Sequence, residues 1–162
     1  MDPKPNANPS LTVEKALNFL NRGWCAIYLI LDEESLNQQE FKILAYFTLS
    51  HKTLIPEQAS KTKVKAVTKG FQHAESIHFV LIGQLGKHIE KLPDGTFKGA
   101  AISSQEILDY AFEIIEESNE LIPCGCVLIE CSDEEKLHQI YKNYGFKFFQ
   151  EDNDLFQFYK VL

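Results

Sequence analysis

A run of small and hydroxyl-bearing residues precedes one of the predicted helices. It consists of Gly99, Ala100, Ala101, Ser103 and Ser104. Backbone N–H groups at the start of a helix lack intrahelical partners, and together with the aligned peptide dipoles they favour a negative charge. Small side chains permit close approach, the serine hydroxyls can donate hydrogen bonds, and Lys98 before the run adds a positive charge. The segment could therefore bind a phosphate group, but the residues alone favour an ordinary capped helix behind a loop.

The four cysteines do not form a pattern typical of a metal site. Cys124 and Cys126 would lie on the same face of a strand, and no second close pair of Cys or His completes the usual ligand set of zinc. Together with Cys131 they lie in or beside the apolar run 124–131, where we expect a buried strand. We interpret these three and Cys25 as reduced core thiols and predict no metal.

Lysines gather in one segment that could contact the phosphates of a nucleic acid. They are Lys61, Lys63, Lys65 and Lys69. The chain as a whole has a net charge of -7 and a pI near 5.2, and Arg22 is its single arginine. No aromatic platform accompanies the lysines, and the overall charge repels phosphate polymers. We therefore expect a solvated loop here, with nucleic acid an unlikely partner.

Length and composition indicate one packed domain. The chain has 162 residues, of which 44% are hydrophobic and 24% charged. No stretch approaches the roughly 20 apolar residues of a membrane span. Residues 1–10 contain three prolines and lack the order of a secretory signal. We expect a flexible arm at 1–10, a single domain at 11–162, a cytoplasmic location and no membrane contact.

Hydrophobic spacing predicts the elements that must position the candidate residues. It predicts helices over about 11–22, from Ser103 or Ser104 to the loop at Pro123, and over 133–144. It predicts strands over 24–31, 41–50, 76–87, 124–131, 146–149 and 155–161, and the first of these is short and apolar, as is typical of a buried strand. The first two strands should form an antiparallel pair around a hairpin loop at 37–39, whereas 51–70 and 88–101 should be long connections. Gly83 and Gly86 indicate a bulge, or close approach of another backbone, in strand 76–87.

This order of elements resembles the GNAT superfamily of acyl-CoA-dependent N-acetyltransferases. Three segments carry the resemblance: LIGQLGK at 81–87, DGTFKGAAISSQEIL at 94–108 and IECSDEEKLHQIYKNYGFKFF at 129–149. The last is similar to the strand, helix and FYEK-x-GF ending of that family, and YFTLS at 46–50 resembles a strand of its toxin-like branch. The resemblance implies an α/β fold of the GNAT-like acyl-CoA N-acyltransferase type, with a mixed central sheet and a bulged strand.

Two departures from the family stand out. The pyrophosphate signature Q/R-x-x-G-x-G/A falls at 99–104, where the sequence has GAAISS and the later glycines are missing. The first strand and helix of the family have little room before Leu11, so the N-terminal edge of the fold should be reduced or rearranged.

The resemblance also implies roles for individual residues. The main chain of Leu85, Gly86 and Lys87 would hold the pantetheine amides and direct a backbone N–H to the thioester carbonyl. The loop from Lys98 to Ser104 would bind the CoA pyrophosphate. Tyr141 would lie near the CoA sulfur, where a phenol with an ordinary pKa of about 10 can protonate a departing thiolate. Tyr141 also belongs to an apolar stripe, so a purely structural role remains open.

The general base is less evident. Glu130 at the end of a strand and His78 early in another could accept the ammonium proton directly or through water. Each also has a structural explanation, Glu130 as a rim carboxylate and His78 as a strand-face residue.

The resemblance implies an acetyl-CoA-dependent N-acetyltransferase, with acetyl-CoA as cosubstrate and direct attack by a primary amine. The alternatives are a GNAT-fold binding module that has lost turnover and a toxin-like acetyltransferase acting on aminoacyl-tRNA. Because an acidic protein concentrates cationic amines, we expect a small amine or a peptide amine as acceptor more readily than tRNA. We expect a monomer or a homodimer.

Overall fold

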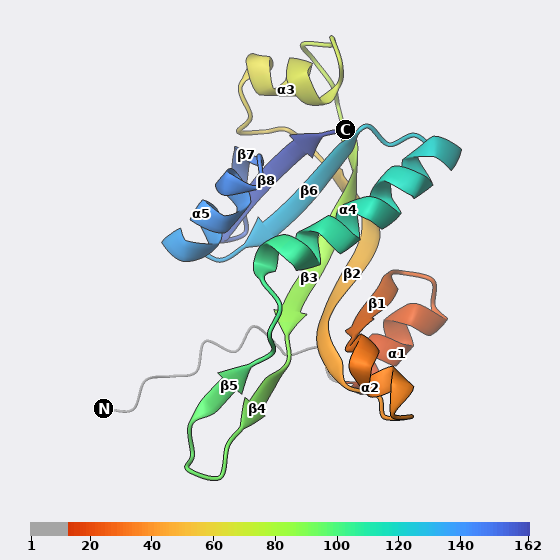
Figure 1. Ribbon diagram of the computed structural model, residues 1–162. Helices are drawn as coiled ribbons and strands as arrows, with labels where there is room; N and C mark the ends of the chain where they lie inside the picture. Colours follow the sequence, from red (N-terminus) through yellow and green to blue (C-terminus); the bar gives the residue numbers. More distant parts are fainter. Residues whose placement is uncertain (1–12) are drawn as a thin grey trace.

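The structure is a computed structural model that describes residues 13–162 (Figure 1). The predicted arm at 1–10 and the two residues after it lie outside the described residues. Five helices are described: α1 (Val13–Asn21), α2 (Glu33–Asn37), α3 (Lys61–Val67), α4 (Ser104–Leu121) and α5 (Glu135–Asn143). Eight strands accompany them: β1 (Ala26–Leu31), β2 (Ile43–Leu54), β3 (Ile77–Lys87), β4 (Ile89–Lys91), β5 (Phe97–Gly99), β6 (Cys126–Cys131), β7 (Lys147–Asp152) and β8 (Leu155–Val161).

Six strands form one mixed sheet in the order β1-β2-β3-β6-β8-β7. Its strand pairs are antiparallel except β3 and β6, which run parallel through Val80–Val127 to Ile82–Ile129. Helix α4 provides the long connection between β3 and β6 (Figure 1), as a parallel pair requires. The predicted α/β class and mixed central sheet are confirmed.

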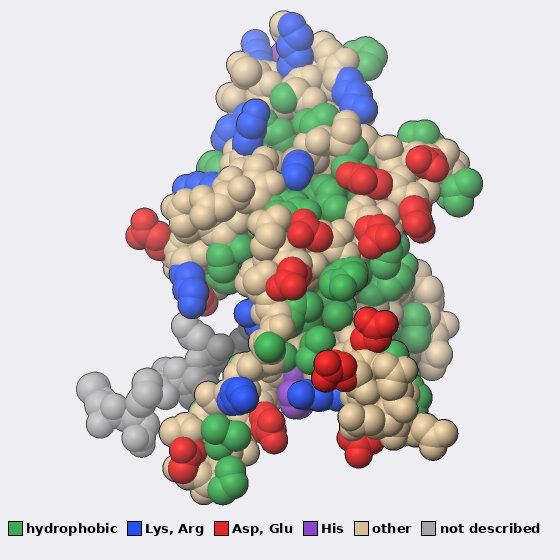
Figure 2. Space-filling model, in the orientation of Figure 1, with side chains coloured by type: hydrophobic (Ala, Val, Ile, Leu, Met, Phe, Trp, Pro, Cys, Tyr) green, Lys and Arg blue, Asp and Glu red, His purple; other side chains and the backbone are tan. Residues whose placement is uncertain are grey.

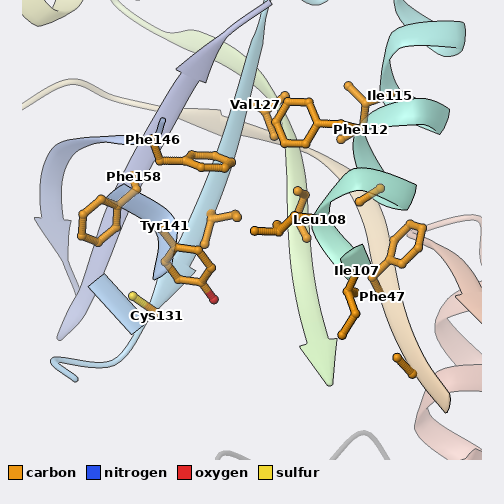
Figure 3. Packing of buried hydrophobic residues seen from close by; sticks show 14 of the residues in the cluster. Phe47, Ile107, Leu108, Phe112, Ile115, Val127, Cys131, Tyr141, Phe146 and Phe158 are labelled. Carbon is orange, nitrogen blue, oxygen red and sulfur yellow. The ribbon is translucent and has the colours of Figure 1, made fainter. Parts of the chain in front are cut away.

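The sheet has a hydrophobic cluster on each face. Residues of α4 and α5, such as Ile107 and Tyr141, pack with Val127 and Phe158 on one face (Figure 3). On the other face, α3 packs its two buried valines against Phe79 and neighbouring strand residues. Successive residues of a strand point to opposite faces, and accordingly Val127 and Leu128 belong to different clusters. We call these the α4/α5 face and the α3 face.

The predicted bulge lies in β3. Phe47 is paired with Leu85 but Leu49 with Ile82, so β3 holds one extra residue opposite Thr48. The Thr48 hydroxyl accepts a hydrogen bond from the backbone N–H of Gln84 at 2.9 Å, which replaces the lost ladder bond.

Both glycines of β3 are explained by close side chains rather than by another backbone. A Cβ at Gly83 would lie 3.0 Å from the Thr48 hydroxyl oxygen, and a Cβ at Gly86 would lie 2.7 Å from the ring of Tyr46. Any side chain at position 86 would therefore displace the Tyr46 ring.

The prediction of a structureless connection over 51–70 is wrong. Strand β2 continues to Leu54, and α3 follows with Ser60 as its N-cap. Because only Val64 and Val67 of this short helix are buried, its apolar spacing is too sparse to show a period.

The connection over 88–101 also contains structure, contrary to the prediction. Strands β4 and β5 form a hairpin that extends away from the sheet (Figure 1), and all six of their residues are exposed. An exposed hairpin needs no alternation of apolar and polar residues, so the hydrophobic pattern does not reveal it.

The first two strands pair as predicted, but two details differ. Helix α2, capped by the Asp32 side chain, occupies part of the segment expected to be a hairpin loop. Strand β1 is a half-buried edge strand rather than a buried one, with Leu29 55% exposed. No helix in the described part of the chain is long and apolar enough to cross a membrane.

Candidate functional site

A cavity of about 350 Å³ lies where the two parallel strands part. The β3–β6 ladder ends at Ile82 and Ile129, yet β3 continues to Lys87 and β6 to Cys131. Residues 82–85 and 129–132 line the cavity, together with Tyr46, Leu137, Tyr141 and Leu155. Beyond Ile82, the β6-facing edge of β3 is therefore free to hydrogen-bond a ligand.

Tyr141 reaches this cavity from α5. The side chain is 8% exposed, and the ring packs against Phe146 and Phe158 with centroid distances of 6.2 and 6.1 Å (Figure 3). Its hydroxyl has no hydrogen-bond partner among the described residues. Burial raises the pKa of Tyr141 to about 12, so the phenol is protonated at neutral pH.

Glu130 reaches the same cavity from the α3 face of β6. One carboxylate oxygen, Oε1, accepts hydrogen bonds from Lys52 Nζ and from Gln157 Nε2, each at 2.6 Å. Gln157 is completely buried, and its Oε1 has no hydrogen-bond partner in the part of the chain that the structure describes. The ion pair is only partly exposed, with 31% for Lys52 and 13% for Glu130. Among residues 13–162, none donates a hydrogen bond to the second oxygen of Glu130.

Glu130 and Tyr141 therefore approach the cavity from opposite faces of the sheet. Ile129 and Cys131 on either side of Glu130 belong to the cluster that includes Tyr141, whereas Glu130 points the other way. A group seated between β3 and β6 could contact the phenol on one side and the carboxylate on the other.

Further polar side chains line the α3 face beside the cavity. The Tyr46 hydroxyl donates to Gln84 Oε1 at 3.4 Å, and the Tyr46 ring lies over Gly86. Sequence reasoning missed Tyr46, Lys52, Gln84 and Gln157, because the register of strands far apart in the chain brings them together.

The predicted cofactor residues fall into three places. Leu85 lines the cavity, and Gly86 and Lys87 follow it on β3. Lys98 and Gly99 belong to the exposed strand β5. Ala100 and Ala101 lead from β5 to the start of α4, where Ser103 and Ser104 lie.

The start of α4 is closed by a capping box. Ser103 Oγ accepts from the N–H of Glu106 at 3.1 Å, and Glu106 Oε2 accepts from the N–H of Ser103 at 2.7 Å. These hydrogen bonds hold the pKa of Glu106 below its usual value. An ionised carboxylate of the chain itself therefore lies at the helix terminus where the family resemblance implies binding of the CoA pyrophosphate.

The second base candidate is not in the cavity. His78 lies near the start of β3, and its Nδ1 is 2.8 Å from the Thr53 hydroxyl on β2. Of the two candidate bases, the structure brings only Glu130 together with Tyr141.

Charge is distributed unevenly over the molecule. Figure 2 shows basic side chains around α3 and acidic ones along α4. Lys63 is engaged within the chain, because its Nζ donates to the carbonyl of Phe149 at 2.9 Å and lies 4.6 Å from the Phe148 ring. Lys61, Lys65 and Lys69 are exposed.

No family model and no curated protein matches the chain. Solved structures do. AtaT complexed with acetyl-methionyl-tRNAfMet is 16% identical with a TM-score of 0.61, over 90% of this chain and 75% of that one. AtaTR bound with AcCoA is 19% identical with a TM-score of 0.61, over 93% and 77%.

A Tyr→Phe variant of KacT is 14% identical with a TM-score of 0.65, over 93% of this chain and 79% of that one. At these identities the likeness concerns the fold. The chain has the GNAT-like acyltransferase fold of the AtaT and KacT structures.

Proposed function

We propose that this protein is an N-acetyltransferase that transfers an acetyl group from acetyl-CoA to a primary amine. The observation that carries the proposal is the cavity between β3 and β6, with Tyr141 on one side and Glu130 on the other. The similarity to AtaTR bound with AcCoA supports the choice of donor.

The residues present fit the thioester end of such a donor. Beyond Ile82, the free edge of β3, which includes the bulge at 83–84, offers main-chain groups to pantetheine amides. A backbone N–H in this stretch could stabilise the negative charge that develops on the thioester oxygen. The diphosphate fits less well, because Glu106 holds the start of α4.

Each proton of the transfer has a group to handle it. The acceptor nitrogen loses a proton to Glu130, directly or through water, and forms a bond to the carbonyl carbon. The carbon–sulfur bond breaks, and the sulfur takes the phenolic proton of Tyr141. The second proton that the acceptor ammonium loses as the amide forms passes, through water, to the Tyr141 oxygen and restores the phenol. The products are an acetamide and a free thiol.

Release of free thiol tests the proposal. The purified chain is incubated with acetyl-CoA and a panel of small amines, peptides and aminoacyl-tRNA. We expect thiol release that depends on the acceptor and that is greatest with a small amine or a peptide amine. CoA binding without release toward any acceptor would contradict the proposal and favour the binding module.

Aminoacyl-tRNA is the second candidate acceptor. AtaT, which shares this fold, has been solved with acetyl-methionyl-tRNAfMet. In the present chain, Lys61, Lys65 and Lys69 are exposed in and just after helix α3. Three lysines neutralising about three phosphates would give a log–log salt slope of roughly -2 to -3. Set against the net charge of -7, this is a weak and salt-sensitive attraction.

We therefore expect no tight binding of bulk tRNA near physiological salt, measured by fluorescence anisotropy. A variant with Lys61, Lys65 and Lys69 changed to Gln is compared with one carrying the same changes at Lys136, Lys142 and Lys147. Tight binding that is lost only in the first variant would make aminoacyl-tRNA the leading acceptor.

A further inference from the structure

The side chain of Glu106 folds back over the N-terminus of its own helix. Its Oε2 lies 2.7 Å from the backbone nitrogen of Ser103, while Ser103 Oγ lies 3.1 Å from the nitrogen of Glu106. These two contacts use two of the N–H groups that the first helical turn leaves without intrahelical partners. The N–H groups of Ser104 and Gln105 remain for any other anion.

The charge around this terminus also disfavours a second anion. The hydrogen bonds from Ser103 hold the pKa of the Glu106 carboxyl below its usual value, and the positive charge of Lys87 at the end of β3 acts in the same direction. Helix α4 carries no basic residue, and acidic side chains line its surface (Figure 2). They are Glu106, Asp109, Glu113, Glu116, Glu117 and Glu120.

The free edge of β3 is a separate feature. It runs from Gly83 to Lys87 beside the cavity and depends on main-chain groups that Glu106 does not contact. The thiol arm of a donor and its diphosphate would therefore meet different surroundings. The β3 edge is open to the thiol arm, whereas the start of α4 is already occupied by the Glu106 carboxylate.

We propose that Glu106 is a specificity-determining residue: it competes with the diphosphate of an acyl-CoA for the N-terminus of α4, so that the pantetheine arm supplies most of the affinity for the donor. This inference rests on the proposed function. It implies that the chain discriminates little between CoA and a pantetheine thiol without the nucleotide.

Glu106→Gln separates the charge from the capping geometry. Glutamine at this position of a capping box can still accept the hydrogen bond from Ser103, so α4 keeps its start while the negative charge is lost. Glu113→Gln is the matched control, because it removes the same charge from an exposed position two turns further along α4.

Isothermal titration calorimetry with CoA and with pantetheine measures the effect. For the wild type we expect dissociation constants of the two ligands within about threefold of each other. Glu106→Gln should bind CoA about tenfold more tightly, equivalent to about 1.4 kcal/mol, with pantetheine unchanged. Glu113→Gln should change neither value.

The outcomes distinguish this inference from the proposed function. If the wild type binds CoA much more tightly than pantetheine, or if Glu106→Gln leaves CoA affinity unchanged, the competition is disproved while the donor site stands. If neither ligand binds to the wild type or to the variant, the proposed function fails and this inference fails with it.

Discussion

Tyr141→Phe should lower kcat about 100-fold or more while leaving the affinity for CoA unchanged. The substitution removes only the hydroxyl, and the ring can keep its packing against Phe146 and Phe158. Loss of a positioned general acid typically costs two to four orders of magnitude. The measurement is acceptor-dependent thiol release, with CoA affinity followed separately by calorimetry.

Tyr144→Phe is the control for this substitution. The Tyr144 hydroxyl donates to Asp109 at 2.8 Å, and Tyr144 does not line the cavity. Its loss should cost about 1 kcal/mol of stability without changing turnover.

Because burial raises the pKa of Tyr141 to about 12, ionisation of this phenol should not lower the wild-type rate from about pH 6 to about pH 10. Retention of more than about a third of wild-type kcat by Tyr141→Phe would exclude the acid role.

Elements with a clear apolar period were predictable from the sequence. Helix α4 buries residues spaced by three and four positions, and β6 is a short apolar run next to turn residues, so both were identified. Helix α3 buries only two residues and the β4–β5 hairpin none, so neither carries a periodic signal. An element could therefore be predicted from the sequence when it buries a regular row of apolar side chains, and not merely because it is a helix or a strand.

The candidate site was predictable only in part. The resemblance identified Tyr141, and the position at a strand end identified Glu130. Lys52 and Gln157 come from strands on either side of β3 and β6, and sheet register alone brings them to Glu130. Local spacing cannot reveal such a contact.

The sequence carries one local signal of the occupied start of α4. Ser103 followed three residues later by Glu106 is the pattern of a capping box, and it predicts a carboxylate at the start of α4. The same serine also fits a phosphate loop. Only the positions of the side-chain atoms show that the helix terminus is already occupied.

Glu130→Gln should lower turnover about 100-fold at neutral pH if Glu130 removes the proton of the acceptor ammonium. Glutamine can keep the shape of the site and still accept hydrogen bonds from Lys52 and Gln157, so a large loss of rate reflects the missing base. The defect should shrink as the pH rises toward about 10, where alkylammonium acceptors lose the proton without assistance. Thiol release at several pH values measures this recovery.

A structural role for Glu130 predicts a different pattern. Gln157 is fully buried and Lys52 is partly buried, so weakening their shared acceptor could lower stability without touching the chemistry. In that case the melting temperature would fall, and the rate per folded molecule would stay near the wild-type value at every pH. Glu135→Gln, on the exposed side of α5, controls for the change in net charge. A defect that is independent of pH would remove Glu130 from proton transfer and leave it as the anchor of the Lys52–Gln157 cluster.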